Sequence, residues 1–209
     1  ALADPAPNLN LLDRYLVLME KSRIPAGILF NKTDLASKED RARYERIYEA
    51  AGYRVLFASA GQGIGMEDVR VYLEGKTTVL AGPSGVGKSS LTNRLMPEAN
   101  METGAVSQKI RRGRHTTRHS ELFCVEPGTY LMDTPGFSSV FVFDMEPEEL
   151  AGYFPEFESY KDACRFLGCV HMGEQVCGVK DAAKAGEISR SRYKNYRLIY
   201  EELKGKRRY

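Results

Sequence analysis

No hydrophobic run in this sequence is long enough to cross a membrane, so we expect neither a membrane-spanning segment nor a membrane partner. A strong excess of charge is also lacking, because the net charge of the 209 residues is only +2. Bulk charge therefore gives no reason to expect a nucleic-acid partner. The distribution of charge along the chain does give one.

Positive charge is concentrated in two stretches. Residues 109–118 contain five basic side chains and no acidic one, and residues 190–208 are also rich in arginine and lysine. Clusters of this kind can contact RNA phosphates. A solvated helix face and a mobile loop would have the same composition, so both interpretations stay open.

A glycine-rich segment near the middle of the chain carries the clearest chemical signal. It matches the phosphate-loop pattern G-x-x-x-x-G-K-[ST], follows an apolar run at 77–81 that predicts a buried strand, and precedes a short helical pattern at 90–95. Backbone N–H groups of such a loop converge on phosphate oxygens, whereas the alternative is an ordinary glycine-rich turn. The residues expected to contact a nucleotide here are Gly82, Pro83, Ser84, Gly85, Val86, Gly87, Lys88, Ser89 and Ser90.

Two side chains of this loop have predicted roles of their own. Lys88 can reach the β- and γ-phosphates, and the Ser89 hydroxyl can bind Mg²⁺. A phosphate-loop protein works where nucleotide and Mg²⁺ are found, so we expect it in the cytoplasm, where thiols stay reduced.

The segment Asn31-Lys32-Thr33-Asp34 follows an apolar run at 27–30 that predicts a short strand. An ionised Asp34 can accept hydrogen bonds from the N1–H and the 2-amino group of guanine, and adenine offers neither donor. We expect Asn31 to tie the nucleotide-binding loops together and the Lys32 stem to lie along the base, with Thr33 in the same contact segment. Alone, these four residues equally indicate a turn followed by a helix N-cap.

A second base contact is predicted after the strand at 54–57. Ser59 and Ala60 follow this strand, and a backbone N–H group at this place can meet the base oxygen. Their signal is weak alone and gains value because they come after Asp34. Apolar periodicity predicts helices at 9–22, 38–51 and 66–73 around these strands. In the first of these helices, the predicted apolar stripe consists of Leu9, Leu12, Leu16 and Met19.

Residues 99–120 show little apolar periodicity, and we expect a long mobile loop there. Thr117 in this loop is a candidate Mg²⁺ ligand that senses the γ-phosphate. Runs at 121–125 and 129–132 then predict two strands joined by a turn. The second strand leads into a D-x-x-G pattern, which offers Asp133 to the Mg²⁺ shell and the Gly136 N–H to the γ-phosphate, although a simple β-turn is the alternative.

Three of the four cysteines cluster with a histidine near the end of the chain, as Cys164, Cys169, His171 and Cys177. Three thiolates and one imidazole close a tetrahedral Zn²⁺ shell with no open position, so the predicted zinc is structural. A region of about 65 residues has a thin core, which a metal helps to hold. Unligated cysteines and a surface histidine are the alternative.

The guanine-nucleotide elements stand in an unusual order. The base-reading segments precede the phosphate-reading segments, whereas ordinary small GTPases have the reverse order. Such a circular permutation is tolerated when the termini lie close together. Together with the cysteine motif, the order resembles that of the circularly permuted GTPases of the RsgA/YjeQ family, and the resemblance covers essentially the whole chain.

The resemblance implies a GTPase that acts on the 30S subunit and its 16S rRNA late in assembly, with hydrolysis stimulated by the small subunit. It also implies an N-terminal OB-fold barrel and a strand before the first helix. Neither is in this sequence, so we expect that an N-terminal part is missing.

Catalysis departs from the pattern of small GTPases, because Phe137 stands where they have a water-orienting glutamine. The resemblance points to His115 as the candidate catalytic replacement. A histidine near its ordinary pKa can orient or accept a proton from water. A loop histidine that contacts RNA or solvent is the alternative.

We therefore predict an α/β fold. A circularly permuted P-loop GTPase domain, with a mostly parallel sheet and helices on both faces, would span residues 1–144 without its first strand. A small, mainly helical zinc domain would span residues 145–209. The expected protein is a monomer that uses Mg²⁺ with GTP and one structural Zn²⁺. A nucleotide-gated RNA-binding module with little hydrolysis, and another P-loop NTPase or nucleotide kinase, are the alternatives.

Overall fold

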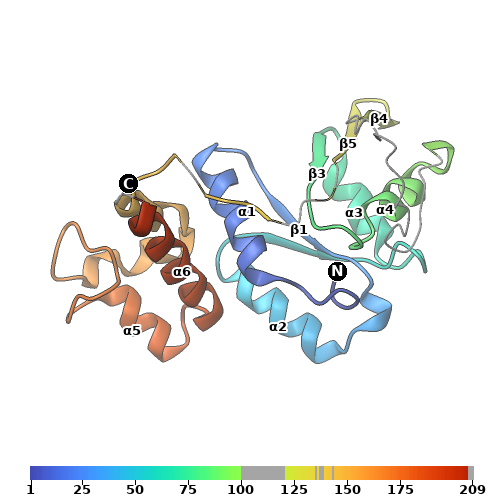
Figure 1. The fold of residues 1–209 in the computed structure, drawn as a ribbon. Coiled ribbons are helices and arrows are strands. Elements are labelled where there is room, and N and C mark those ends of the chain that lie inside the picture. The colour runs from blue at the N-terminus through green and yellow to red at the C-terminus, as the bar shows by residue number, and fades with distance from the viewer. Residues whose placement is uncertain (100–120, 135, 137–138, 143, 207–209) are drawn as a thin grey trace, which may run out of the picture. The chain divides into compact units, whose positions relative to one another are not determined.

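The chain forms two compact units. The computed structural model describes residues 1–99, 121–134, 136, 139–142 and 144–206 (Figure 1). Unit 1 contains Ala1–Pro7, Leu29–Arg41 and Leu56–Ser138, and unit 2 contains Asn8–Ile28, Ala42–Val55 and Ser139–Tyr209. Neither unit is a single stretch of sequence, and the predicted domain boundary at residue 144 stays a prediction.

Strands and helices alternate through the first part of the chain, at the places that the periodicity predicted. The α-helices and β-strands in chain order are α1 (Leu9–Lys21), β1 (Gly27–Phe30), α2 (Lys38–Glu49), β2 (Arg54–Phe57), α3 (Met66–Leu73), β3 (Thr77–Leu80), α4 (Lys88–Leu95), β4 (Glu121–Glu126), β5 (Thr129–Asp133), α5 (Gly178–Ala185) and α6 (Arg190–Lys206). Short 3₁₀ segments are η1 (Thr33–Leu35), η2 (Pro97–Ala99), η4 (Pro147–Tyr153) and η5 (Pro155–Ala163). No helix in the described part of the chain is both long and apolar enough to span a membrane.

Unit 1 carries a three-stranded sheet with β5 in the middle. β5 pairs in parallel with β3 and antiparallel with β4, while β1 and β2 form a separate two-stranded sheet. The register of the parallel pair places Leu80 opposite Asp133, so the carboxyl ends of both strands lie side by side. Side chains of α3 and α4, such as Leu73 and Leu91, share one buried core with Leu131 of β5.

β3 is a strand as predicted, but it is not buried. Val79 is 54% exposed, and Thr77 is exposed on the same face. β3 forms one edge of the three-stranded sheet, which accounts for part of this exposure. A run of apolar and β-branched residues predicts extended structure, but it does not reveal whether both faces of the strand are covered.

Unit 2 has a core that contains several packed aromatic rings. The rings of Phe154, Phe157 and Tyr196 are buried, with centroids 5.0–5.2 Å apart. Other apolar side chains of α6, such as Ile199 and Leu203, complete this core. Tyr196 and Tyr200 of this helix are buried and Tyr193 is half-buried, so its tyrosines pack largely inside the protein. The segments η4 and η5 are helical as expected, but they are 3₁₀ rather than α-helical.

α1 also belongs to unit 2, and its buried side differs from the prediction. The sequence predicted a stripe of Leu9, Leu12, Leu16 and Met19. The structure buries Leu11, Asp13, Leu16 and Val17. The periodicity identified the helix but placed its inner side wrongly, because a buried carboxylate does not count as apolar in such a pattern.

That carboxylate belongs to a buried charge cluster. Arg192 of α6 donates to Asp13 at 2.8 Å and makes two hydrogen bonds to Glu156, at 2.7 and 2.9 Å. Asn195 and Tyr48 also donate to Asp13, at 2.5 and 3.1 Å. Burial alone would lower the pKa of Arg192, but the two carboxylates raise it above its ordinary value, so the guanidinium stays charged.

Replacing Arg192 by methionine should strongly destabilise unit 2. Arg192→Met leaves Asp13 and Glu156 buried without their cation, and breaking such a cluster costs about 3–5 kcal/mol. Urea unfolding of the variant and the wild type measures this loss. Arg197→Met on the exposed side of the same helix is the control and should change the free energy of unfolding by less than about 0.5 kcal/mol. Similar losses in both variants would contradict the assignment.

Candidate functional site

The phosphate loop connects β3 to α4 in unit 1. It curls around its own lysine, because the Lys88 ammonium donates to the carbonyls of Gly82 at 2.9 Å and Pro83 at 3.1 Å. Gly85 and Gly87 have φ values of 79° and 91°, a backbone region that other residues rarely adopt. These glycines turn the loop into α4, whose N-terminus begins at Lys88. The arrangement is that of a phosphate-binding loop.

The D-x-x-G segment lies directly beside this loop. The Thr134 hydroxyl donates to the Leu80 carbonyl at 2.6 Å, which ties the end of β5 to the end of β3. A Cβ added at Gly136 would lie 2.8 Å from the Ser84 nitrogen and 3.2 Å from the Lys88 ammonium. Only glycine therefore allows this approach. No role was predicted for Thr134, and the hydroxyl between Asp133 and Gly136 is the signal that could have identified it.

Asp133 and Lys88 face each other in a partly buried setting. Burial raises the pKa of Asp133, and the Lys88 charge and the Ser89 hydroxyl oppose this shift. Burial lowers the pKa of Lys88, and Asp133 opposes that shift. The Oδ1 atom of Asp133 is buried and has no hydrogen-bond partner among the described residues. A hydroxyl and a free carboxylate oxygen are ligands that Mg²⁺ prefers, so these residues fit a magnesium ion held directly or through water.

Asn31 connects the predicted base-reading segments to the phosphate loop. Its Nδ2 donates to the Val86 carbonyl at 3.0 Å, and its Oδ1 accepts the Ala60 N–H at 3.0 Å. A Cβ added at Gly87 would lie 2.4 Å from Asn31 Nδ2, so this contact also requires glycine at position 87. The structure thus brings together three segments that are far apart in the sequence.

The rest of the base-reading segments lie at the ends of β1 and β2. The Ala58 N–H donates to the Phe30 carbonyl at 3.0 Å, and the Thr33 N–H donates to the Ala58 carbonyl at 3.1 Å. Asp34 lies in η1 with an exposed side chain. The Ser59 N–H donates to the Ile64 carbonyl at 2.9 Å. The N–H groups of Ser59 and Ala60 thus both donate to acceptors within the chain. A base oxygen could accept from one of them only if that intramolecular hydrogen bond broke.

Two predicted site residues, His115 and Thr117, lie outside the described residues. Their roles stay predictions. Phe137 also lies outside them. The nucleotide contacts of the other predicted residues stay predictions as well.

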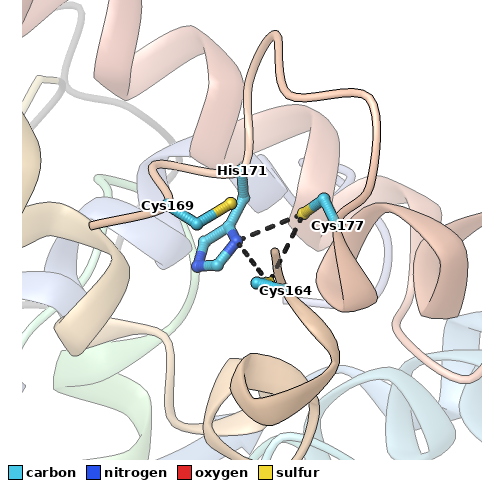
Figure 2. A group of neighbouring side chains, drawn as sticks. All are labelled: Cys164, Cys169, His171 and Cys177. Atoms are coloured by element: carbon cyan, nitrogen blue, oxygen red, sulfur yellow. Dashed lines mark hydrogen bonds between the residues drawn. The ribbon is translucent and has the colours of Figure 1, made fainter. Parts of the chain in front are cut away.

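The second candidate site is a cluster of sulfur and nitrogen atoms in unit 2. Ligand atoms of Cys164, Cys169, His171 and Cys177 all lie within 4.8 Å of one another (Figure 2). The two sulfurs of Cys164 and Cys177 are 3.9 Å apart, and His171 Nδ1 lies 3.7 and 3.3 Å from them. Zn–S bonds of about 2.3 Å and a Zn–N bond of about 2.0 Å in a tetrahedron would separate sulfurs by about 3.8 Å and sulfur from nitrogen by about 3.5 Å. The cluster therefore fits Zn²⁺.

The chemistry of these donors also fits a cation. Burial raises the pKa of the Cys169 thiol to about 12 and raises that of Cys177 as well. Burial lowers the pKa of His171, which keeps the imidazole neutral and able to bind a metal. The Cys169 and Cys177 thiols, whose pKa values are raised, ionise together only when a cation compensates their charge.

Replacing Asn31 by aspartate should weaken nucleotide binding. Asn31→Asp keeps the acceptor for the Ala60 N–H but places a negative charge against the Val86 carbonyl, which loses its donor. Losing one such bond costs about 1–3 kcal/mol, or about 5- to 150-fold in affinity. Titration with a fluorescent guanosine diphosphate measures the change. Gln175→Glu adds the same charge at an exposed position of unit 2 and should leave affinity unaltered, and equal affinities of all three proteins would contradict the role of Asn31.

Comparisons with known proteins identify the family of this chain. A family model described as RsgA GTPase matches residues 1–143. The small ribosomal subunit biogenesis GTPase RsgA of Agathobacter rectalis is 53% identical over 209 residues, which are 100% of this chain and 69% of that protein. The protein of the same name from Alkaliphilus metalliredigens is 49% identical over 100% of this chain and 72% of its own length.

Two solved structures are similar to the whole fold. YjeQ from Thermotoga maritima has a TM-score of 0.79 and 38% identity, over 98% of this chain and 69% of that one. YloQ, described as a circularly permuted GTPase, has a TM-score of 0.77 and 36% identity, over 98% of this chain and 66% of that one. The predicted α/β fold is confirmed, and the chain belongs to the RsgA GTPase family.

Proposed function

We propose that this chain binds GTP, hydrolyses it to GDP and phosphate, and acts in late maturation of the 30S ribosomal subunit. The observation that carries the nucleotide part is the Asn31 amide, which joins the base-side segments to the phosphate loop. The ribosomal part is supported by relatives that are named small ribosomal subunit biogenesis GTPases. Such a role implies a cytoplasmic protein.

Guanine selectivity would come from Asp34. Its exposed carboxylate can accept hydrogen bonds from the N1–H and the 2-amino group of guanine. Lys32 would lie along the base, and Thr33 and Ser59 would complete the base-side segments. The Ala60 N–H would turn from Asn31 Oδ1 to the base oxygen when nucleotide binds.

The phosphates would lie on the loop from Gly82 to Ser89, with Lys88 at the β- and γ-phosphates. Ser89 and Thr117 would hold Mg²⁺, and Asp133 would support its shell. Mg²⁺ supplies positive charge at the phosphates when it is bound. Gly136 would offer its N–H to the γ-phosphate, since it lies against Ser84 and Lys88. Ser90, in the first turn of α4, would be the last nucleotide contact of this segment.

Unit 2 would bind one structural Zn²⁺ through Cys164, Cys169, His171 and Cys177. Four protein ligands leave no open position for a substrate, so the ion would stabilise the fold rather than take part in hydrolysis. The domain boundary that we propose stays at residue 144, with the zinc domain after it.

The partner would be the 30S subunit, contacted through its 16S rRNA by a monomer of this chain. α6 supports this, because several of its basic side chains are exposed and available to RNA phosphates, among them Arg190, Lys194, Arg197 and Lys204. Aromatic side chains of the same helix are largely buried, so contact with RNA would be to phosphates rather than by base stacking.

Exchanging Asp34 for asparagine tests the nucleotide preference. Asp34→Asn replaces one acceptor by a donor, so affinity for GTP should fall about 100-fold or more. The new amide can donate to the 2-oxo group of xanthine, so affinity for XTP should rise. Competition titrations with GTP, XTP and ATP measure the three affinities. Asp162→Asn at an exposed position of unit 2 is the control, and tight ATP binding by the wild type would favour another P-loop NTPase.

Replacing His115 by alanine tests the proposed hydrolysis. We expect slow GTP turnover by the wild type and faster turnover with purified 30S subunits. His115→Ala should lower both rates while GDP affinity stays the same, because the imidazole would act on water and not on the bound nucleotide. His119→Ala is the matched histidine control.

Two results would contradict this part of the proposal. Unchanged turnover in His115→Ala would remove the catalytic role of that residue. No turnover by the wild type, even with 30S subunits, would favour the nucleotide-gated RNA-binding module.

A further inference from the structure

The turn around His171 is held by a carboxylate outside the ligand set. Glu174 accepts the Val170 N–H with Oε1 and the Met172 N–H with Oε2, each at 2.7 Å. One side chain therefore binds both backbone groups that flank the histidine. The Glu174 carbonyl is itself bound by the Lys180 ammonium at 2.6 Å, which ties this turn to α5.

α6 holds the same turn from another direction. The Tyr193 hydroxyl donates to the His171 carbonyl at 2.7 Å, and the Tyr196 hydroxyl donates to the Val170 carbonyl at 2.5 Å. The rings of Phe157 and His171 also meet edge to face, with centroids 5.7 Å apart. Backbone and ring of His171 are thus fixed by residues that are not members of the ligand cluster.

This support matters because the backbone at His171 has an unusual conformation. His171 has a φ of 56°, in the left-handed region where a residue other than glycine needs help from its surroundings. In this conformation its Nδ1 lies 3.3 Å from Cys177 Sγ and 3.7 Å from Cys164 Sγ. Dashed lines mark these two interactions in Figure 2. Another backbone conformation would swing the ring away from the sulfur atoms.

The loop that carries the first two cysteines is built differently. Between Cys164 and Cys169, Phe166 is 56% exposed and Leu167 is fully exposed. Cys177, in contrast, is buried and is the N-cap residue of α5, where its sulfur accepts the Lys180 N–H. The half of the site that contains His171 and Cys177 is therefore the more strongly supported half.

We propose that Glu174 is a positioning residue for the metal, which sets the turn at His171 so that Nδ1 faces the three sulfur atoms. Tyr193 and Tyr196 support the same turn. This inference rests on the zinc site proposed above. Zinc affinity is raised because the histidine is in place before the ion arrives, and less of the site has to become ordered on binding.

The test uses the whole chain with Zn²⁺ as the probe, in competition with a chromophoric chelator. Glu174→Gln keeps the size of the side chain but turns one acceptor into an NH₂ group that faces a backbone N–H. We expect zinc to bind about 10- to 100-fold more weakly, and Tyr193→Phe to weaken binding in the same direction. Glu201→Gln and Tyr200→Phe, both on α6, are the matched controls and should leave zinc affinity unchanged.

Cobalt(II) separates positioning from a general loss of stability. The wild type saturated with Co²⁺ should show the absorption of a tetrahedral site with three sulfurs and one nitrogen. His171→Ala should show a different spectrum, because water replaces the imidazole. The spectrum of folded Glu174→Gln should move toward that of His171→Ala, a change that loss of stability alone does not produce.

The outcomes are distinct. Wild-type zinc affinity and an unaltered cobalt spectrum in both Glu174→Gln and Tyr193→Phe would overturn the inference. If Glu174→Gln does not fold, Tyr193→Phe decides, because it removes a single hydroxyl. A wild-type chain that binds no stoichiometric zinc would overturn the zinc site itself, and the inference with it.

Discussion

The nucleotide site of unit 1 depends on one side-chain amide. Asn31 donates to the Val86 carbonyl and accepts the Ala60 N–H, both at 3.0 Å, so a single residue fixes the base-side segments against the phosphate loop. Gly87 has to be glycine for two independent reasons. Its φ of 91° disfavours a side chain, and a Cβ there would meet the Asn31 amide at 2.4 Å. Both the backbone turn of the phosphate loop and the contact of this loop with Asn31 thus require glycine at position 87.

On the phosphate side, the site is built from charges that burial disfavours. Burial shifts Asp133 and Lys88 toward their neutral forms, and each opposes the shift of the other. The pair is incomplete, because Asp133 keeps a buried oxygen without a partner and the Lys88 ammonium is bound only by carbonyls of its own loop in the described contacts. A phosphate group and a magnesium ion carry the charges that would complement Lys88 and Asp133, respectively. A nucleotide with its metal is therefore expected to stabilise unit 1 by binding its folded form.

The sequence predicts those features whose functional residues lie close together in the chain. The phosphate loop, the D-x-x-G segment and the four cysteine and histidine ligands each lie within fourteen positions or fewer, and their spacing fixes what they can bind. The buried cluster of Asp13, Glu156 and Arg192 was missed, because Asp13 and Arg192 are 179 positions apart and no local pattern connects them. The exposure of β3 was missed for a similar reason, since the burial of a strand depends on what covers it. The nucleotide contacts stay predictions, as do His115 and Thr117.

α6 explains how unit 2 combines a buried charge cluster with the cluster of cysteine and histidine side chains. Arg192 and Asn195 of α6 both bind Asp13 of α1, and they are three positions apart, so they lie on one side of the helix. Tyr193 and Tyr196 have the same spacing one position further along, and their hydroxyls bind the turn at His171. Adjacent faces of one helical turn thus support two different structures. A rotation or shift of α6 would disturb the contacts with α1 and those with the turn at His171 together, although no side chain of the charge cluster belongs to the cysteine and histidine cluster.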